Sequence, residues 1–218
     1  MIIIKTFTYR IYPTKKQVYI MNHWIKECRW LYNHFLEERI NAYKDLGVRV
    51  NFNDQSIALP DLKKERPTLS NVCDSVLQDV VKRVDISFKN FFRRVKEAKE
   101  EKPELPRLRS KNEYNSLTFP GSKFRFINNK KLHIIKIGNI KINLHRPFKG
   151  IIKTCTIKRS HTDKWYISFT CKCKPKINNT THEIYQPDRS IEPPPYQIVS
   201  EGGGSNPYID ITRKYKFW

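Results

Sequence analysis

Residues 5–18 read KTFTYRIYPTKKQV, and this stretch sets the architecture of the chain. Its first half alternates in character, and alternation predicts a half-buried strand over residues 2–12. One side of that strand carries Lys5, Phe7, Tyr9 and Ile11, and the other side carries Thr6, Thr8, Arg10 and Tyr12. Pro13 stops the strand, and Thr14 with Gln17 forms a capping box, which predicts that a helix starts here.

A long amphipathic helix is therefore expected from Thr14 to about Leu46, because apolar residues recur there at helical spacing. They are Val18, Met21, Ile25, Cys28, Tyr32, Phe35 and Tyr43. Gly47 suits the end of this helix, because glycine readily adopts the left-handed conformation after a last turn. The stretch with Pro60 and Pro67 is interpreted as a short irregular connection, since proline interrupts helices.

A second long helix is predicted from about Ser75 to Glu100. Its apolar side consists of Leu77, Val80, Val81, Val84, Phe88, Phe91, Phe92 and Val95. At 100° per residue, a polar and mostly cationic stripe falls on the far side of the same helix. The stripe consists of Gln78, Lys82, Lys89, Arg93 and Lys96. It is either an ordinary solvated face or a surface that contacts nucleic acid.

After Pro103 and Pro106 the hydrophobic period changes to two, which predicts strands. They are expected at 116–119, 123–127, 131–135, 140–144, 151–159 and 164–173, and the last two form a hairpin. Many short strands of this kind close into a small barrel, and the first strand should pair with them. The predicted fold class is therefore α+β: a small β-barrel with a helical domain inserted after its first strand.

The expected domain boundaries follow from these elements. Residues 1–12 form the first strand of the barrel, 13–105 the inserted helical domain, and 106–175 the rest of the barrel. Residues 176–218 contain asparagine–threonine, triple-proline and triple-glycine runs, which predict an irregular, disordered tail.

The chain has 218 residues and a formal net charge of +21, from 42 Lys+Arg and 21 Asp+Glu. Residues 176–218 hold five basic and five acidic residues, so the whole excess lies in the first 175 residues. Nucleic acid is the expected partner, because a polyanion would relieve this self-repulsion. A basic surface kept for solubility is the alternative. A membrane surface is disfavoured, because no helix pairs a basic face with an exposed apolar one.

Other functional classes find little support in the sequence. No apolar run reaches the roughly 18 residues that a membrane span needs, and the opening MIII is too short for a signal peptide. A cytoplasmic location is therefore expected. The cysteines, which lack any C-x2-C pair, are expected to be reduced packing residues, and no metal, cofactor or small-molecule substrate is expected. They are Cys28, Cys73, Cys155, Cys171 and Cys173.

Several segments together resemble a known family. They are TFTYRIYPT at 6–14 with Gln17, CRWLYN at 28–33, SVLQ at 75–78, FKNFF at 88–92, PRLRS at 106–110, HRP at 145–147 and KWYISF at 164–169. In order and spacing they resemble the N-terminal half of the TnpB (OrfB) proteins, transposon-encoded RNA-guided nucleases related to type V CRISPR effectors.

The resemblance implies an oligonucleotide-binding-like barrel, the wedge domain, interrupted by a helical recognition domain. In the family, this half grips a guide RNA and reads a short duplex motif beside the DNA target. A RuvC-like nuclease with a Gly-Ile-Asp-x-Gly strand and a zinc ribbon follow, and cleavage there needs clustered carboxylates that hold metal ions. Neither pattern occurs here, and Asp188 and Asp210 lack the required surroundings. We therefore expect a chain truncated before the nuclease, without catalytic residues or metal ligands.

Three functional hypotheses remain open. In the first, the chain is the nucleic-acid-binding module of a transposase-like protein, and it binds structured guide RNA and target-adjacent duplex DNA without cleaving them. In the second, it is a degenerate, frameshifted remnant of an RNA-guided endonuclease, with no selected activity. In the third, it is a half-enzyme that needs a nuclease partner in trans.

The candidate binding residues lie mostly on the second helix and the connection after it. They are Ser75, Gln78, Lys82, Lys89, Arg93, Lys96, Arg107, Arg109, Lys111 and Thr118, together with Arg10 and Arg29. Glutamine can pair with adenine in a major groove, and the cations suit phosphate contacts. Ser75 could instead cap its helix, and Thr118 could reach a groove edge.

Aromatic residues offer a second kind of contact, because they can stack on unpaired bases. The candidates are Tyr9, Tyr12, Trp30, Tyr114, Phe119 and Phe126. Aromatic residues at strand and helix spacing more often belong to the core.

Overall fold

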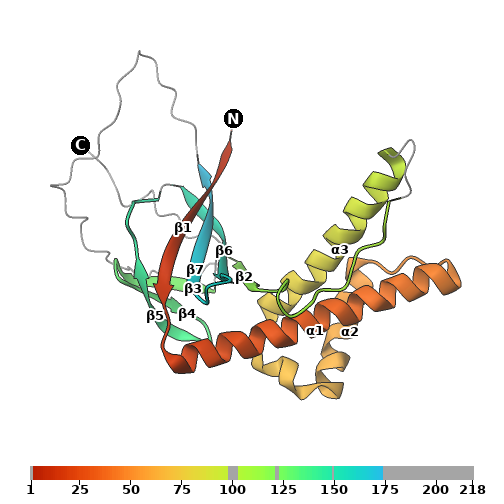
Figure 1. Cartoon of the computed structure of the whole chain (residues 1–218), viewed down its shortest axis with the longest axis horizontal. Coiled ribbons are helices and arrows are strands. Elements are labelled where there is room, and N and C mark those ends of the chain that lie inside the picture. The colour runs from red at the N-terminus through yellow and green to blue at the C-terminus, as the bar shows by residue number, and fades with distance from the viewer. Residues whose placement is uncertain (1, 98–102, 121–122, 149, 174–218) are drawn as a thin grey trace, which may run out of the picture.

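A computed structural model describes residues 2–97, 103–120, 123–148 and 150–173 of the chain (Figure 1). The elements in chain order are β1 (Ile3–Tyr12), α1 (Lys15–Leu46), α2 (Phe52–Glu65), the short 3-10 helix η1 (Pro67–Asn71), α3 (Asp74–Glu97), β2 (Ser116–Pro120), β3 (Phe124–Asn128), β4 (Lys131–Ile134), β5 (Gly138–Asn143), β6 (Ile151–Arg159) and β7 (Trp165–Cys173). The strands form one sheet, and α1 starts beneath it and runs away from it (Figure 1). The expected tail at 176–218 lies outside the described residues.

The first strand belongs to the same sheet as the later strands, as predicted. The sheet order is β2-β6-β7-β1-β5-β4-β3, and all its pairings are antiparallel. β1 lies at its centre, between β7 and β5, although the three helices separate it from both in sequence. The helices are therefore an insertion after the first strand.

The sheet curls strongly, and its inner face holds an aromatic cluster. Phe124 of β3 lies 5.5 Å from Phe169 of β7, between ring centroids, although three strands separate β3 from β7 in the sheet. Phe126 and Phe148 also approach Phe169, at 5.3 and 5.6 Å. The result is a seven-stranded half-barrel with β2 and β3 at its two ends, where a closed barrel was expected. The oligonucleotide-binding-like assignment is not confirmed.

The start of α1 is fixed twice, once locally and once to the sheet. Thr14 and Gln17 form the predicted capping box, with the Gln17 N–H donating to Thr14 Oγ1 at 3.3 Å. Gln17 Nε2 also donates to the Asn139 carbonyl at 2.8 Å, so the capping residue anchors the helix to β5. Gly47 follows the helix with φ of 64°, the left-handed conformation that was expected.

The prediction of an irregular connection around Pro60 was wrong, because α2 runs through this proline. Asn51 caps α2 by accepting from the N–H groups of Asn53 and Asp54, and Asp54 accepts from Asn51 N at 2.8 Å. Proline removes one hydrogen bond of a helix, and the exposed Pro60 leaves the packing of buried Leu59 intact. The Asn-x-x-Asp spacing was the sequence signal that would have revealed this helix.

The second long helix is α3, and its apolar side was assigned correctly except near its end. Val80, Val84 and Phe88 lie in the core, whereas Val95 is 46% exposed. The predicted end at residue 100 lies outside the described residues. All five cysteines are buried, and burial raises the pKa of the Cys28 and Cys155 thiols, which therefore act as apolar packing groups.

Candidate nucleic-acid interface

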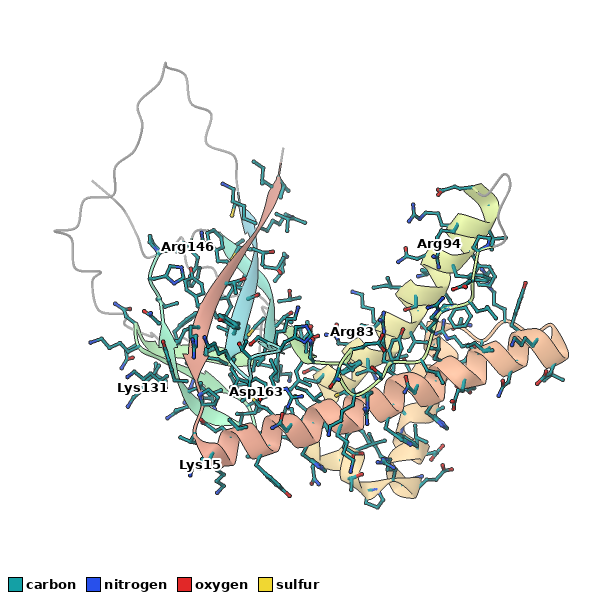
Figure 2. The ribbon with its side chains drawn as sticks, in the orientation of Figure 1. Lys15, Arg83, Arg94, Lys131, Arg146 and Asp163 are labelled. Carbon is teal, nitrogen blue, oxygen red and sulfur yellow. The ribbon has the colours of Figure 1, made fainter. Side chains whose placement is uncertain are left out.

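The cationic stripe of α3 faces solvent, as its helical phase predicted. Figure 2 shows α3 with the labelled side chains of Arg83 and Arg94. The exposed residues of the stripe are Gln78, Lys82, Lys89, Arg93 and Lys96, and Ser75 is half-buried one turn before them. Ser75 is the second residue of α3, and its hydroxyl lies 3.2 Å from Cys73 Sγ. The opposite side of α3 packs into the core, so this helix presents one face to any partner.

The cations of the stripe are not equivalent, because two of them have acidic neighbours. Lys89 pairs with Asp85 at 2.7 Å, and Arg93 approaches Glu97 at 3.6 Å. For Lys82 and Lys96, no ion pair occurs within the described part of the chain. These two lysines are therefore the cations of the stripe that are best placed to pair with phosphate groups.

Arg83 joins α3 to the sheet, and sequence reasoning missed it. Its guanidinium donates to Asp79 at 2.6 Å, to Ser116 Oγ at 3.1 Å and to Thr118 Oγ1 at 2.6 Å. Burial lowers the pKa of Arg83, but Tyr114 and Asp79 outweigh burial and hold this pKa above its ordinary value. Arg83 therefore fixes the corner where α3 and the outer face of β2 meet.

Thr118 lies at this corner, where its hydroxyl already accepts from Arg83 and lies 3.0 Å from Thr156 Oγ1. The Thr118 hydroxyl that was predicted to reach a groove edge therefore also holds Arg83 against β2. The signal for Arg83 was its position at the edge of the apolar side, four residues after Asp79, which favours an ion pair.

The other predicted cations lie apart from the stripe. Arg109 lies on the connection between α3 and β2, and its backbone N–H donates to Asn33 Oδ1 of α1 at 2.8 Å. Arg107 on the same connection pairs with Glu104. Lys111 is exposed there, and Arg29 is half-buried on α1. The structure thus gathers the stripe and Thr118 and leaves the rest on neighbouring surfaces.

The outer face of the sheet continues from this corner as two rows of hydroxyl side chains. The rows are Thr118, Thr156, Ser168 and Thr8, then Thr154, Thr170 and Thr6, each in register across neighbouring strands. Thr8 Oγ1 and Ser168 Oγ lie 2.8 Å apart. Arg10 lies on the same outer face, on β1, which is separated from β2 by two strands.

Most of the aromatic stacking candidates serve the core. Tyr9, Tyr114 and Phe119 are each at most 5% exposed, and Phe126 is half-buried in the aromatic cluster. Trp30 stacks on His34 at 4.9 Å, and Arg66 covers its ring. Tyr12 differs, because 47% of its surface is exposed.

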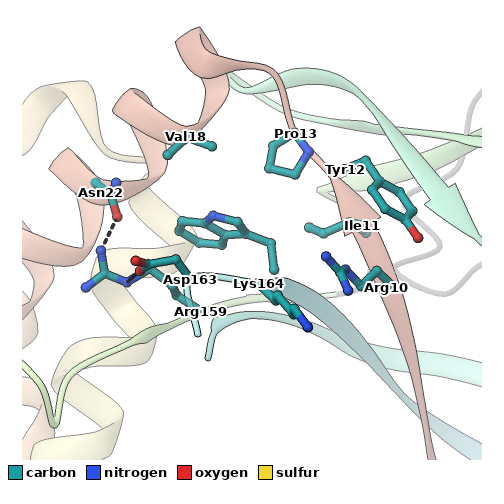
Figure 3. A pocket seen from close by; sticks show the side chains of 10 residues that line it. Arg10, Ile11, Tyr12, Pro13, Val18, Asn22, Arg159, Asp163 and Lys164 are labelled. Carbon is teal, nitrogen blue, oxygen red and sulfur yellow. Dashed lines mark hydrogen bonds and ion pairs between the residues drawn. The ribbon is translucent and has the colours of Figure 1, made fainter. Parts of the chain in front are cut away.

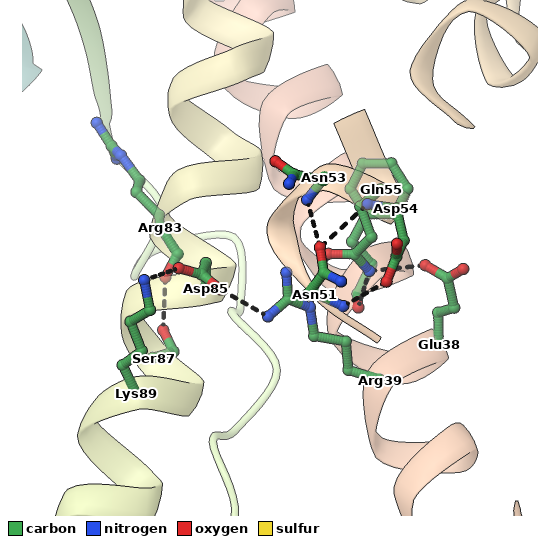
Figure 4. Close-up of polar contacts among 11 residues, drawn as sticks. Glu38, Arg39, Asn51, Asn53, Asp54, Gln55, Arg83, Asp85, Ser87 and Lys89 are labelled. Atoms are coloured by element: carbon green, nitrogen blue, oxygen red, sulfur yellow. Dashed lines mark hydrogen bonds and ion pairs between the residues drawn. The ribbon is translucent and has the colours of Figure 1, made fainter. Parts of the chain in front are cut away.

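Buried ion pairs hold the helices together, and none of them was expected from the sequence. Arg39 of α1 donates to Gln55 of α2 at 2.8 Å and to Asp85 of α3 at 3.2 Å, so one side chain links three helices (Figure 4). Glu27 accepts from Arg66 at 2.7 Å and from Thr68 at 2.9 Å. We call these two networks the helix joints.

Two kinds of feature are missing from the described residues. No group of three or more His, Cys, Asp or Glu side chains in that part of the chain could hold a metal ion. None of its helices is long and apolar enough to cross a membrane.

Residues 1–47 match the family described as a helix-turn-helix domain, HTH_OrfB_IS605. In this chain these residues form β1 and α1, so within the match one helix follows a strand. A helix-turn-helix motif has two helices joined by a tight turn. The match therefore shows similarity of sequence, while the described residues of the match, 2–47, do not form a helix-turn-helix motif.

The chain is also similar to a protein of Streptomyces pristinaespiralis named "Putative RNA-guided DNA endonuclease". The two are 30% identical over 174 residues, which cover 77% of this chain and 41% of that protein. The chain thus spans less than half the length of the curated relative that it matches. Both comparisons agree with the resemblance seen in the motifs: the N-terminal residues are similar to the OrfB-type domain, and most of the chain is similar to part of this RNA-guided endonuclease.

Proposed function

We propose that this chain is a nucleic-acid-binding module of a TnpB/OrfB-like protein, which holds guide RNA and target-adjacent duplex DNA and does not itself cut them. The observation that carries the proposal is the exposed stripe of α3. Its cations lie opposite a helix face that packs mostly into the core, within a protein of net charge +21. The relationship to an RNA-guided nuclease family supports the same kind of partner.

The dimensions of the stripe suit a nucleic-acid backbone. Lys82 and Lys96 are 14 residues apart, which is about 21 Å along a helix that rises 1.5 Å per residue. Duplex DNA carries one charge per about 1.7 Å of its axis, so a stripe of this length spans several phosphates. These contacts would supply affinity without sequence information.

Sequence reading would come from the start of α3 and the corner beside it. Gln78 is exposed there, and its Oε1 accepts one hydrogen bond from Ser56 at 3.3 Å, which leaves its amide N–H groups to pair with a base. Thr118 lies across the corner on β2. Phosphate contacts along α3 would fix the register in which Gln78 meets the bases.

Binding is tested with the purified chain and a fluorescently labelled DNA duplex or structured RNA, by anisotropy at 100 mM salt. The triple variant Lys82→Gln, Arg93→Gln, Lys96→Gln should weaken binding of the DNA duplex at least about tenfold, because each lost phosphate contact forfeits counterion release. The matched control is Lys16→Gln, Lys26→Gln, Lys44→Gln, three exposed lysines of α1. Equal losses in both variants would contradict the proposal.

The absence of cleavage is tested separately. The same duplex and RNA are incubated with the chain and magnesium or manganese, and the products are separated on a denaturing gel. Intact substrates are expected. Metal-dependent cuts that persist after repeated purification would overturn this part of the proposal and leave the binding part standing.

A further inference from the structure

A band of cations and tyrosines crosses the outer face of the sheet beside the hydroxyl rows. It consists of Lys158 on β6, Tyr166 on β7, Arg10 and Tyr12 on β1, and Lys141 on β5. Lys158 lies opposite Tyr166, Tyr166 opposite Arg10, and Tyr12 opposite Lys141. Four neighbouring strands thus bring together residues that lie up to 156 positions apart in the sequence.

The charged groups and the rings of the band are in direct contact. The Arg10 guanidinium carbon lies 5.3 Å from the centre of the Tyr12 ring and 5.9 Å from that of Tyr166. Lys141 Nζ lies 5.9 Å from the centre of the Tyr12 ring. A cation within about 6 Å of an aromatic face is attracted by it, so these contacts orient Arg10 between the two rings.

The charged groups of the band differ from those of the helix joints, because they have no acidic partner among the described residues. The Arg10 side chain has no hydrogen bond or ion pair with another described side chain, and its buried Nε has no acceptor there. Tyr12 keeps 47% of its surface exposed, and Lys141 and Lys158 are exposed. The band therefore offers an open ring together with cations that no carboxylate of the described residues neutralises.

A pocket of about 540 Å³ opens beside Arg10 and Tyr12, where β1 passes into α1 (Figure 3). Pro13, Val18 and Trp165 give it apolar walls. Lys164 adds a further exposed cation at this pocket. Sites for small planar groups have volumes of about 300–1,000 Å³ and combine apolar walls with a few polar groups, so there is room here for one base.

We infer that this band and its pocket bind unpaired nucleotides, with bases against Tyr12 and Tyr166 and phosphates beside Arg10, Lys141 and Lys158. The inference rests on the proposed function and adds that the outer face of the sheet binds single-stranded nucleic acid. Bases expose their flat faces to a protein only when they leave a duplex, and surfaces for single strands combine aromatic rings with a basic groove. A duplex, in contrast, would meet the cations of the band without using its rings.

The test measures binding of a mixed-sequence ten-nucleotide single strand and of the same sequence as a duplex, by anisotropy with the full chain. The variant Tyr12→Leu, Tyr166→Leu should lose about tenfold or more in single-strand affinity, because stacking on each ring contributes substantially. Its duplex affinity should change less than twofold. The matched control Tyr12→Phe, Tyr166→Phe keeps both rings and should bind the single strand like the wild type.

Three outcomes overturn the inference. They are an unchanged single-strand affinity in the leucine variant, an equal loss for duplex and single strand, and the same loss in the phenylalanine variant. Circular dichroism of each variant verifies that the sheet is intact, and the Phe variant keeps the test valid if the Leu variant unfolds. Failure of the proposed function looks different, because the wild type would then bind neither nucleic acid.

Discussion

The helix joints and the exposed stripe of α3 use the same residue types in opposite ways. In the joints, Arg39 is 4% exposed and Glu27 is 2% exposed, and each is held by an oppositely charged partner. On the stripe, Lys82 and Lys96 are exposed, and within the described chain no carboxylate pairs with them. Net charge alone does not separate these two groups. The two groups differ in whether an oppositely charged side chain of the described residues pairs with them.

The comparison also indicates how much stability is lost when an ion pair is broken in each of the two regions. Removing one partner of a buried pair leaves an uncompensated charge, which typically destabilises a protein by about 3–5 kcal/mol. An exposed pair contributes about 0–1 kcal/mol. The joints should therefore control stability and the stripe should control binding, and the following substitutions test this division.

The largest effect is expected for Asp85→Asn, which leaves Arg39 buried without a carboxylate. The free energy of unfolding should fall by about 3 kcal/mol, because the cost of a buried and unpaired charge is not recovered elsewhere. Urea denaturation followed by circular dichroism gives this value. A loss below about 1 kcal/mol would mean that the joint behaves like a surface pair, and the comparison would fail.

The next effect concerns the corner between α3 and β2. Thr118→Val keeps the shape of the side chain but removes the acceptor for Arg83, so the free energy of unfolding should fall by about 1.5 kcal/mol. Thr118→Ser should be close to the wild type. If Thr118→Val weakens duplex binding while stability is unchanged, then Thr118 contacts the nucleic acid directly and does not hold the corner between α3 and β2.

A smaller effect is expected on acidification below about pH 4. Burial raises the pKa of Glu27, but the hydrogen bonds from Arg66 and Thr68 outweigh it, and the pKa lies below its ordinary value. For Asp85, burial is likewise outweighed by the hydrogen bonds from Lys89 and Arg39. Both carboxylates therefore stabilise the fold fully above their unfolded pKa values, near 4, and lose this contribution as the pH falls through the lower folded values.

Unfolding free energies measured at pH 6 and at pH 3 should show this loss, and Glu27→Gln should depend less on pH over the same interval. If the unfolding free energy of Glu27→Gln fell between pH 6 and pH 3 as much as that of the wild type, then Glu27 would not contribute to the acid dependence.

The smallest effect is expected for Asp61→Asn, which breaks the exposed pair with Lys64. Both side chains are more than 70% exposed, so solvent screens the pair and its loss should leave the melting temperature almost unchanged. A thermal melt beside that of Asp85→Asn shows the difference directly. A loss comparable to that of Asp85→Asn would show that burial does not decide the cost of a broken pair.

The sequence revealed local structure well and contacts between distant segments poorly. The capping box at Thr14 and Gln17, the end of α1 at Gly47 and the hydrophobic phase of α3 depend on neighbours within one turn, so pattern reasoning could find them. Helix α2 was missed because Pro60 was given more weight than the Asn51 cap. For the features that were predicted and for the helix that was missed, the decisive information lay within a few residues.

The binding surfaces depend on register, which the sequence does not reveal. Alternation along β7 shows only that Tyr166 and Trp165 lie on opposite faces of their strand. That Tyr166 lies opposite Arg10 follows only from how β1 enters the sheet. For the same reason Arg83 was not recognised as the link to Thr118, and Arg39 was not recognised as the link between three helices.

The salt dependence of duplex affinity tests the central claim most directly, because it counts the phosphate contacts that each surface makes. The logarithm of the binding constant is plotted against that of the salt concentration for the wild type and the two triple variants. The stripe variant should have a slope shallower by about 2.7, since each contact contributes about 0.9, and the α1 control should match the wild type. Equal slopes in all three proteins would show that the stripe makes no contact with the DNA backbone and would contradict the account.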